Sequence, residues 1–138
     1  MGMTDTNEIG YLFFSGPDMD PAAIRSAYPG ARFVARSRLI TADVALPPAY
    51  AGLRGTDIWG ILVAIPSQPA GSVVDVMTDD GRRFQAHLGS EGVLGGAPEA
   101  VLAAARYWEL PPPYIGRLRS LVQALGIPAD EEEPRDGN

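Results

Sequence analysis

Apolar residues gather in short runs along the chain, and the spacing within each run predicts a strand or a helix. Residues 9–14 and 58–65 are nearly continuous apolar stretches of strand length, which is typical of buried strands. Residues 72–77 and 82–88 flank an Asp-Gly pair at 80–81, and such a pair supplies the positive φ angles of a tight turn. We therefore expect two buried strands and a hairpin.

Helix signals appear in three places. Asp20 is a suitable N-cap before a proline, and it predicts a short helix that ends at Ala27. Apolar residues recur at helical spacing over 98–108 and again over 113–125, where Gly126 is expected to cap the second helix. Two helices are thus expected to follow the strands.

The segment 32–46 suits one bent strand or two short ones, with arginines marking a solvent-facing side. Gly60, inside an otherwise apolar run, indicates a bulge or a close backbone approach. The order of a strand, a short helix, several strands and two helices predicts an α+β fold. We expect a mixed, largely antiparallel sheet that is curled or closed into a barrel, with flanking helices.

The length of 138 residues suits one domain. We expect a flexible arm at 1–8, a single domain at 9–127 and an acidic disordered tail at 128–138. No apolar run is long enough to span a membrane, and the polar N-terminus does not resemble a secretory signal. We therefore expect a cytoplasmic protein with no membrane partner.

The composition excludes several kinds of catalytic and metal-binding site. The chain has no cysteine, no lysine and a single histidine, His87. A thiol nucleophile, a Schiff-base lysine and a multi-histidine metal site are thereby excluded, and we expect no metal and no cofactor. The formal net charge is −6, and a nucleic-acid partner is not expected because such proteins more often carry a basic surface. His87 is expected to be structural.

The first candidate site is the loop Ser15-Gly16-Pro17-Asp18, between the first strand and the short helix. A glycine turn at this place presents backbone N–H groups to an anion, although Pro17 removes one donor. An ordinary strand-to-helix turn has the same composition, and the residues alone favour that interpretation.

Two other regions contain candidate ligand-binding residues. The glycine-rich stretch 89–96, which contains Glu91, has the composition of a phosphate cradle but lacks the lysine of that motif, so a mobile lid or hinge is favoured. Trp59, Tyr107, Trp108 and Tyr114 have the size and polarity to line a cavity, and core packing is the default for both tryptophans.

Several segments, taken in order, resemble the gamma-glutamylcyclotransferase-like family over about residues 9–126. They are the aromatic strand and loop 11–18, and the stretches 29–39, 58–62, 82–88 and 107–118. The resemblance implies that the loop holds the head group of a small γ-glutamyl amine or peptide. Phe14 stands at the family's tyrosine, and Ser15, Gly16, Pro17 and Asp18 replace its Gly-Ser-Asn with one residue more. Tyr114 completes the expected ligand-binding set.

The chain departs from the family at the residue that performs its chemistry. In the family, a helix after the Trp-Gly strand carries a glutamate that moves a proton as 5-oxoproline forms. Here Ile65 leads through 66–71 directly into the next strand, and no carboxylate stands between Asp57 and Asp75. Glu91 is the candidate substitute acid.

Asp18 and Asp75 are further candidates for that role, although a solvated or turn-forming acid is favoured at all three positions. Two hypotheses remain open from the sequence. The chain is either a divergent enzyme that releases 5-oxoproline, or a binding or structural module that has lost the family's catalytic glutamate.

Overall fold

The computed structural model describes residues 9–41, 44, 46, 50, 53, 55–67, 69, 71–89, 94 and 97–130, with the side chains of 55 and 125–130 left aside. Five strands form a closed barrel in the order β1-β3-β2-β4-β5, with β5 returning to β1. The strands are β1 (Gly10–Phe14), β2 (Arg32–Leu39), β3 (Trp59–Ile65), β4 (Val73–Thr78) and β5 (Arg83–Leu88). The helical elements are η1 (Pro17–Met19), α2 (Pro21–Ala27), η3 (Gly55–Asp57), α3 (Pro98–Tyr107) and α4 (Pro112–Asp130).

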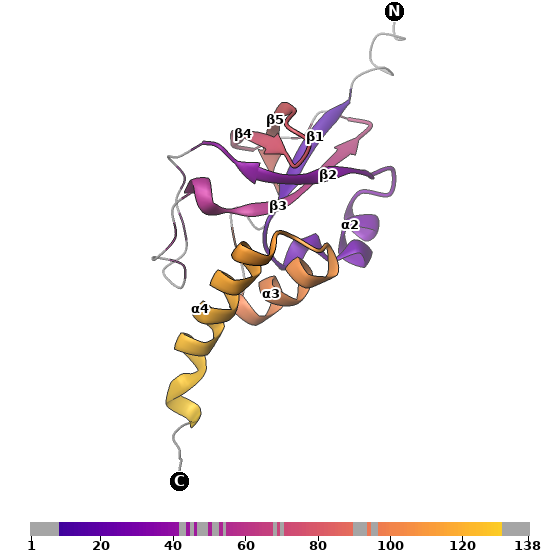
Figure 1. Ribbon diagram of the computed structural model, residues 1–138. Helices are drawn as coiled ribbons and strands as arrows, with labels where there is room; N and C mark the ends of the chain where they lie inside the picture. The colour runs from indigo at the N-terminus through magenta and orange to yellow at the C-terminus, as the bar shows by residue number, and fades with distance from the viewer. Residues whose placement is uncertain are drawn as a thin grey trace, which may run out of the picture.

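The barrel is antiparallel at every pairing except that of β1 with β5. Strand β3 lies between β1 and β2, and the register between β2 and β3 shifts between Phe33 and Ala35. Helices α3 and α4 pack beside one end of the barrel, and α4 continues away from the strands (Figure 1). The predicted α+β class with a mixed, largely antiparallel barrel and flanking helices is confirmed.

Most predicted elements are observed with small shifts at their ends, and two expectations were wrong. The extended segment expected over 32–46 forms a strand only as far as Leu39, and the described residues of that segment after Leu39 lie outside any strand. Asp20 caps α2, its side chain accepting a hydrogen bond from the Ala23 amide at 3.2 Å. Gly126 does not end the last helix, because α4 continues to Asp130. Glycine inside a helix costs about 1 kcal/mol of stability relative to alanine, which is too little to end a helix by itself.

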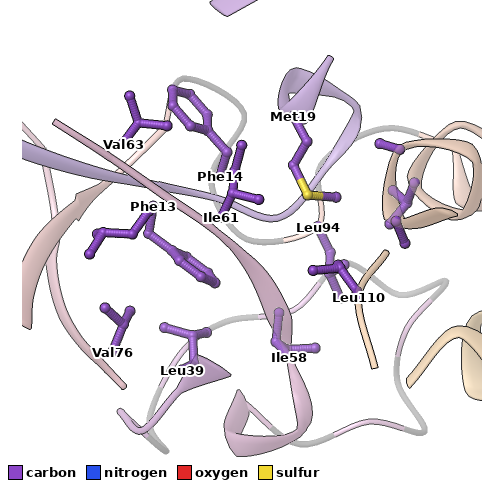
Figure 2. Close-up of a cluster of buried hydrophobic side chains, with 14 of the residues drawn as sticks. Phe13, Phe14, Met19, Leu39, Ile58, Ile61, Val63, Val76, Leu94 and Leu110 are labelled. Carbon is purple, nitrogen blue, oxygen red and sulfur yellow. The ribbon is translucent and has the colours of Figure 1, made fainter. Parts of the chain in front are cut away.

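The core lies between the barrel and the two C-terminal helices. Figure 2 shows how side chains of the strands, the loop after β1 and the helical end meet in one cluster. Phe13, Leu39, Ile61 and Val76 come from four strands and are fully buried. Met19 and Leu110 extend the cluster toward α3 and α4, so the loop after β1 is fixed against the helices.

Gly60 marks a close backbone approach, as its place in an apolar run indicated. A side-chain Cβ at this position would collide with the carbonyl oxygen of Phe14 and press on the ring of Phe13. Strand β1 can therefore lie against the start of β3 only because residue 60 has no side chain. This contact positions the loop that follows Phe14.

Strand β3 is joined to β4 by a short connection. The strand ends at Ile65 and β4 begins at Val73, and the described residues between them contain no helix. The absence of an inserted helix agrees with the interpretation of the sequence. None of the helices in the described part of the chain has the length and apolar character that a membrane span requires.

Candidate functional site

The loop after β1 satisfies most of its own backbone groups. The amide of Gly16 donates to Oδ1 of Asp18 at 3.2 Å. The amides of Met19 and Asp20 donate to the carbonyl oxygens of Gly16 and Pro17 at 3.0 and 3.1 Å, which forms the single turn η1. The loop is therefore a closed turn in which a carboxylate of the chain itself covers one backbone amide.

Ser15 is the buried polar residue of this loop. It is fully buried, and its Oγ accepts a hydrogen bond from the backbone N–H of Leu94 at 3.0 Å. Leu94 has a φ of 54°, a conformation that side-chain-bearing residues seldom adopt. The bond joins the end of β1 to the segment between β5 and α3.

Gly89 allows Phe14 and Asp18 to close over the end of β5. A Cβ at Gly89 would lie 2.5 Å from the ring of Phe14 and 2.8 Å from Oδ2 of Asp18. The amide of Gly89 also donates to the carbonyl oxygen of Phe13 at 3.0 Å. The position of the Asp18 carboxylate thus depends on a glycine 71 residues further along the chain.

Two buried tyrosines have incompletely satisfied hydroxyls. Tyr114, in the first turn of α4, and Tyr50 are at most 2% exposed. Among the described residues, the Tyr50 hydroxyl has no partner, and the Tyr114 hydroxyl has only the backbone of Trp59 as a hydrogen-bonding neighbour, outside good geometry. A buried polar group left unpaired costs about 1–3 kcal/mol, so the Tyr50 hydroxyl in particular is suited to a water or a polar ligand group.

The environment keeps both tyrosine hydroxyls protonated. Burial raises the pKa of Tyr50 to about 12, and the negative charge of Glu99 adds to the effect. Burial also raises the pKa of Tyr114, and the neighbouring Tyr50 raises it further. The backbone of Trp59 partly lowers the pKa of Tyr114 again. The two hydroxyls are therefore near one another and remain hydrogen-bond donors at neutral pH.

Ser15 and Tyr114 approach the same short segment at the start of β3. Gly60 packs against the carbonyl oxygen of Phe14, the residue before Ser15. The backbone of Trp59 is a hydrogen-bonding neighbour of the Tyr114 hydroxyl. We call the buried residues Ser15, Tyr50 and Tyr114 the tyrosine site.

The other side of the loop faces a hollow of about 300 Å³. It is lined by Phe14, Pro17 and Asp18 from the loop and by residues of α2 and its end, which are Ala23, Ile24, Ala27 and Tyr28. The rings of Phe14 and Tyr28 are 6.2 Å apart. Among the described residues of this lining none is basic, and Asp18 is charged.

The structure brings together most of the predicted site residues. Phe14, Ser15, Gly16, Pro17 and Asp18 form one loop, and Tyr114 lies in the core cluster that also holds Phe14. Their role in ligand binding stays a prediction. Glu91 lies outside the described residues.

The remaining acidic candidates near β3 and β4 have other surroundings. Asp75 belongs to the partly exposed face of β4, between the buried residues Val74 and Val76. Asp57 forms an ion pair with Arg117 of α4 at 3.2 Å. Among the described histidine and acidic residues, no group of three is placed to hold a metal ion.

Tyr50 was not predicted as a site residue. It follows Pro47-Pro48 in a segment that was interpreted as a loop, and tyrosines in loops are usually exposed. It is buried as a member of the core cluster, which joins residues far apart in the sequence and is not visible in a local pattern. The ion pair between Asp57 and Arg117 helps to hold the end of this segment against α4.

The comparisons with known proteins agree with this architecture. No family model matches the chain, and no curated protein matches it by sequence. Among solved structures, the chain is similar to a gamma-glutamyl cyclotransferase, with a TM-score of 0.57 and 13% identity over 82% of this chain and 88% of that one. It is also similar to an uncharacterized protein from Homo sapiens, with a TM-score of 0.55 and 13% identity over 96% and 94% of the two chains.

The chain therefore has the fold of a gamma-glutamyl cyclotransferase. The resemblance that the sequence suggested is confirmed at the level of the fold. At 13% identity the likeness establishes the fold alone, and the ligand and the activity have to be argued from the site.

Proposed function

We propose that this protein binds a small amide, related to γ-glutamyl amines, in the tyrosine site, and that it does so without cyclotransferase turnover. The observation that carries the proposal is the pair of buried hydroxyls of Tyr50 and Tyr114, which among the described residues have no hydrogen-bond partner in good geometry. Two phenol donors held in an apolar environment suit an uncharged acceptor such as an amide carbonyl. Tyr50 would gain a partner, and Tyr114 would gain one in addition to the backbone of Trp59.

We infer the absence of turnover from the positions of the acidic residues that would have to transfer the proton. The connection from Ile65 to Val73 contains no carboxylate, and the described part of it contains no helix. Asp18 already accepts a hydrogen bond from the Gly16 amide. General acid–base catalysis contributes on the order of 10²–10⁴ in rate, so loss of the family's glutamate removes most of the reaction that the fold would otherwise support.

The test combines binding and turnover on the intact protein. A panel of γ-glutamyl amino acids, γ-glutamyl amines, glutathione and simple primary amides is titrated by ligand-observed NMR, and 5-oxoproline is followed by mass spectrometry. We expect binding of at least one amide and no 5-oxoproline above a protein-free control. Release of 5-oxoproline overturns the statement about turnover, and the Glu91→Gln variant then asks whether Glu91 supplies the acid.

A matched pair of variants assigns the binding to this site. Tyr114→Phe removes one buried hydroxyl, whereas Tyr107→Phe removes a hydroxyl from a side chain that is 64% exposed. We expect affinity to fall about two- to tenfold in Tyr114→Phe, because one hydrogen bond contributes about 0.5–1.5 kcal/mol. Tyr107→Phe should bind as the parent protein does. Binding that is equal in all three proteins, or absent throughout the panel, overturns the proposal.

A further inference from the structure

Phe33 presents its ring to solvent on a side of the molecule that the proposed function does not use. It is 47% exposed, whereas Val63, its partner on β3, is buried. The register of β2 against β3 shifts just after Phe33, and irregularities of this kind redirect side chains. The ring lies nearly parallel to that of Trp108, with 4.8 Å between the ring centres and 13° between the planes. The two rings form a stacked pair, which we call the aromatic wall.

Trp108 is held in place by the protein itself. Its indole Nε1 donates a hydrogen bond to the carbonyl oxygen of Met19 at 2.8 Å, and its own carbonyl oxygen accepts one from Nε of Arg36 at 2.7 Å. A side chain that is fixed before a ligand arrives loses little conformational entropy on binding. The aromatic wall is therefore preorganised for contact with another flat group.

The aromatic wall borders a hollow of about 190 Å³, which we call the ring hollow. Apart from the two rings and Arg25, its lining consists of apolar residues from α2, β3 and the turn before β2, which are Pro21, Ile24, Ala31 and Val63. A cavity of about 150 Å³ with apolar walls admits a benzene ring. The ring hollow thus has room for one six-membered ring.

A second hollow, of about 490 Å³, adjoins the ring hollow. It lies between α2 and α3, beside the end of the barrel (Figure 1). Pro21 and Arg25 line both hollows, so one side of α2 is common to them. A ligand whose ring occupies the ring hollow has space for its remaining atoms past Arg25.

Arg25 carries the positive charge of this surface. Among the described residues that line the two hollows it is the basic one, and within the described part of the chain its guanidinium has no hydrogen bond or ion pair. The acidic residue of the larger lining, Asp20, accepts a hydrogen bond from the Ala23 amide and does not line the ring hollow. A guanidinium is a planar donor whose geometry matches a carboxylate. Charge complementarity therefore favours an acid at the border of the ring hollow.

We infer that this surface binds a small aromatic acid, whose ring enters the ring hollow against Phe33 and Trp108 and whose carboxylate pairs with Arg25. The aromatic wall supplies apolar contact area, and Arg25 selects an acid over its neutral analogue. None of these three residues belongs to the tyrosine site, so the inference is independent of the proposed function.

The experiment uses two probes that have the same ring and differ in charge. Phenylacetate carries a carboxylate, and phenethyl alcohol carries a neutral hydroxyl in its place. Each is titrated into the isotope-labelled intact protein and followed by NMR. The chain contains two tryptophans, so two indole N–H signals are expected, and the Trp59→Phe variant identifies the signal of Trp108.

Both probes should shift the Trp108 signal in a saturable manner and leave the Trp59 signal nearly unchanged. We expect phenylacetate to bind about threefold to fivefold more tightly than phenethyl alcohol, which is the scale of one exposed ion pair. Neither probe is an amide, so the ligand class proposed for the tyrosine site does not enter the comparison.

Three variants assign the contacts. Arg25→Gln removes the charge and should make the two affinities equal. Arg119→Gln makes the same change at an exposed position of α4, outside both linings, and should keep the preference. Phe33→Ala removes half of the aromatic wall and should weaken both probes by about threefold or more. Thermal unfolding verifies that each variant is folded, and Phe33→Leu replaces Phe33→Ala if the latter is not.

The outcomes decide the inference separately from the proposed function. Equal affinities of the two probes for the parent protein, or a preference that Arg25→Gln leaves unchanged, overturn the role of Arg25. Shifts confined to the Trp59 signal, or affinities that the Phe33 variant does not change, overturn the location of the site. No binding of either probe up to millimolar concentration overturns the whole inference. In every case the amide panel still tests the proposed function.

Discussion

The hydroxyl of Ser15 accepts a hydrogen bond from the amide of Leu94 at 3.0 Å, although the two residues are 79 positions apart. Both residues are fully buried. The bond connects the end of β1, the first strand of the barrel, to the segment that precedes α3. It therefore links the barrel to the helices at the C-terminal end of the domain. The geometry of the tyrosine site depends on this join.

Replacing Ser15 by alanine should therefore destabilise the protein. The variant leaves the Leu94 amide buried without a partner, and such a loss costs about 1–3 kcal/mol. Urea unfolding measures the change in the free energy of unfolding. Ser120→Ala, on the exposed side of α4, is the matched control and should differ from the parent by no more than about 0.5 kcal/mol. Equal stabilities of the two variants would contradict the structural role of Ser15.

Most of the barrel follows from local patterns. The apolar run 58–65 became the strand β3 that lies between β1 and β2, and the Asp-Gly pair at 80–81 became the turn between β4 and β5. The strand order was not predictable in the same way. It depends on which strands meet after the chain collapses, and the parallel pairing of β5 with β1 joins segments 75 residues apart at Leu12 and His87.

The candidate site was only partly predictable. The loop after β1 was identified because strand, glycine turn and helix cap follow one another along the chain. Tyr50 was missed, because its burial is a tertiary effect of α4 and the core cluster. The hydrogen bond from Gly16 to Asp18 was also missed, since the composition of a turn does not reveal where its carboxylate points.

Two glycine substitutions should have opposite effects on stability. Gly60→Ala places a Cβ against the carbonyl oxygen of Phe14, where backbone must shift to accept it. We expect a loss of about 2 kcal/mol or more, within the range of overpacked cores. Gly116→Ala meets no atom within 4 Å and lies inside α4, so it should raise stability by up to about 1 kcal/mol. Thermal unfolding of both variants checks the contrast, and a neutral Gly60→Ala would contradict the close approach of β1 and β3.

Arg36 joins the barrel to the end of α3. Its Nε donates to the carbonyl oxygen of Trp108 at 2.7 Å, and its guanidinium also pairs with Asp79 at 3.4 Å and Glu109 at 3.8 Å. The two ion pairs are largely exposed and should contribute little. The bond to Trp108 is the stabilising contact.

Arg36→Ala should therefore cost about 1.5–3 kcal/mol, the range for a hydrogen bond from a charged group. Most of that loss should persist in 1 M salt, because screening weakens exposed ion pairs more than partly buried hydrogen bonds. Arg32→Ala, at the exposed start of the same strand, is the control and should be nearly neutral. A loss that disappears at high salt would assign the effect to the ion pairs instead.

Alkaline solution should destabilise the protein through its buried tyrosines. Burial raises the pKa of Tyr50 from 10.0 to about 12, and it raises that of Tyr114 as well. The unfolded chain releases these protons near pH 10, whereas the folded chain retains them. Their contribution to stability is thus fully present below about pH 10 and is lost as the pH rises through about 12.

Phenylalanine at position 50 or 114 removes the ionisable hydroxyl and with it that group's contribution to the pH dependence of the free energy of unfolding. We expect the free energy of unfolding of Tyr50→Phe and Tyr114→Phe to fall less steeply than that of the parent between pH 10 and pH 12. Below pH 10 Tyr50→Phe should be as stable as the parent or slightly more stable, because it loses a buried hydroxyl that has no partner among the described residues, and Tyr114→Phe should change stability by no more than the weak contact with the Trp59 backbone. Urea unfolding at a series of pH values measures both effects. If the free energy of unfolding of both variants still falls with pH as steeply as that of the parent, these hydroxyls do not cause the fall. If either variant is much less stable than the parent near pH 7, the hydroxyl that it lacks has a strong hydrogen-bond partner in the protein.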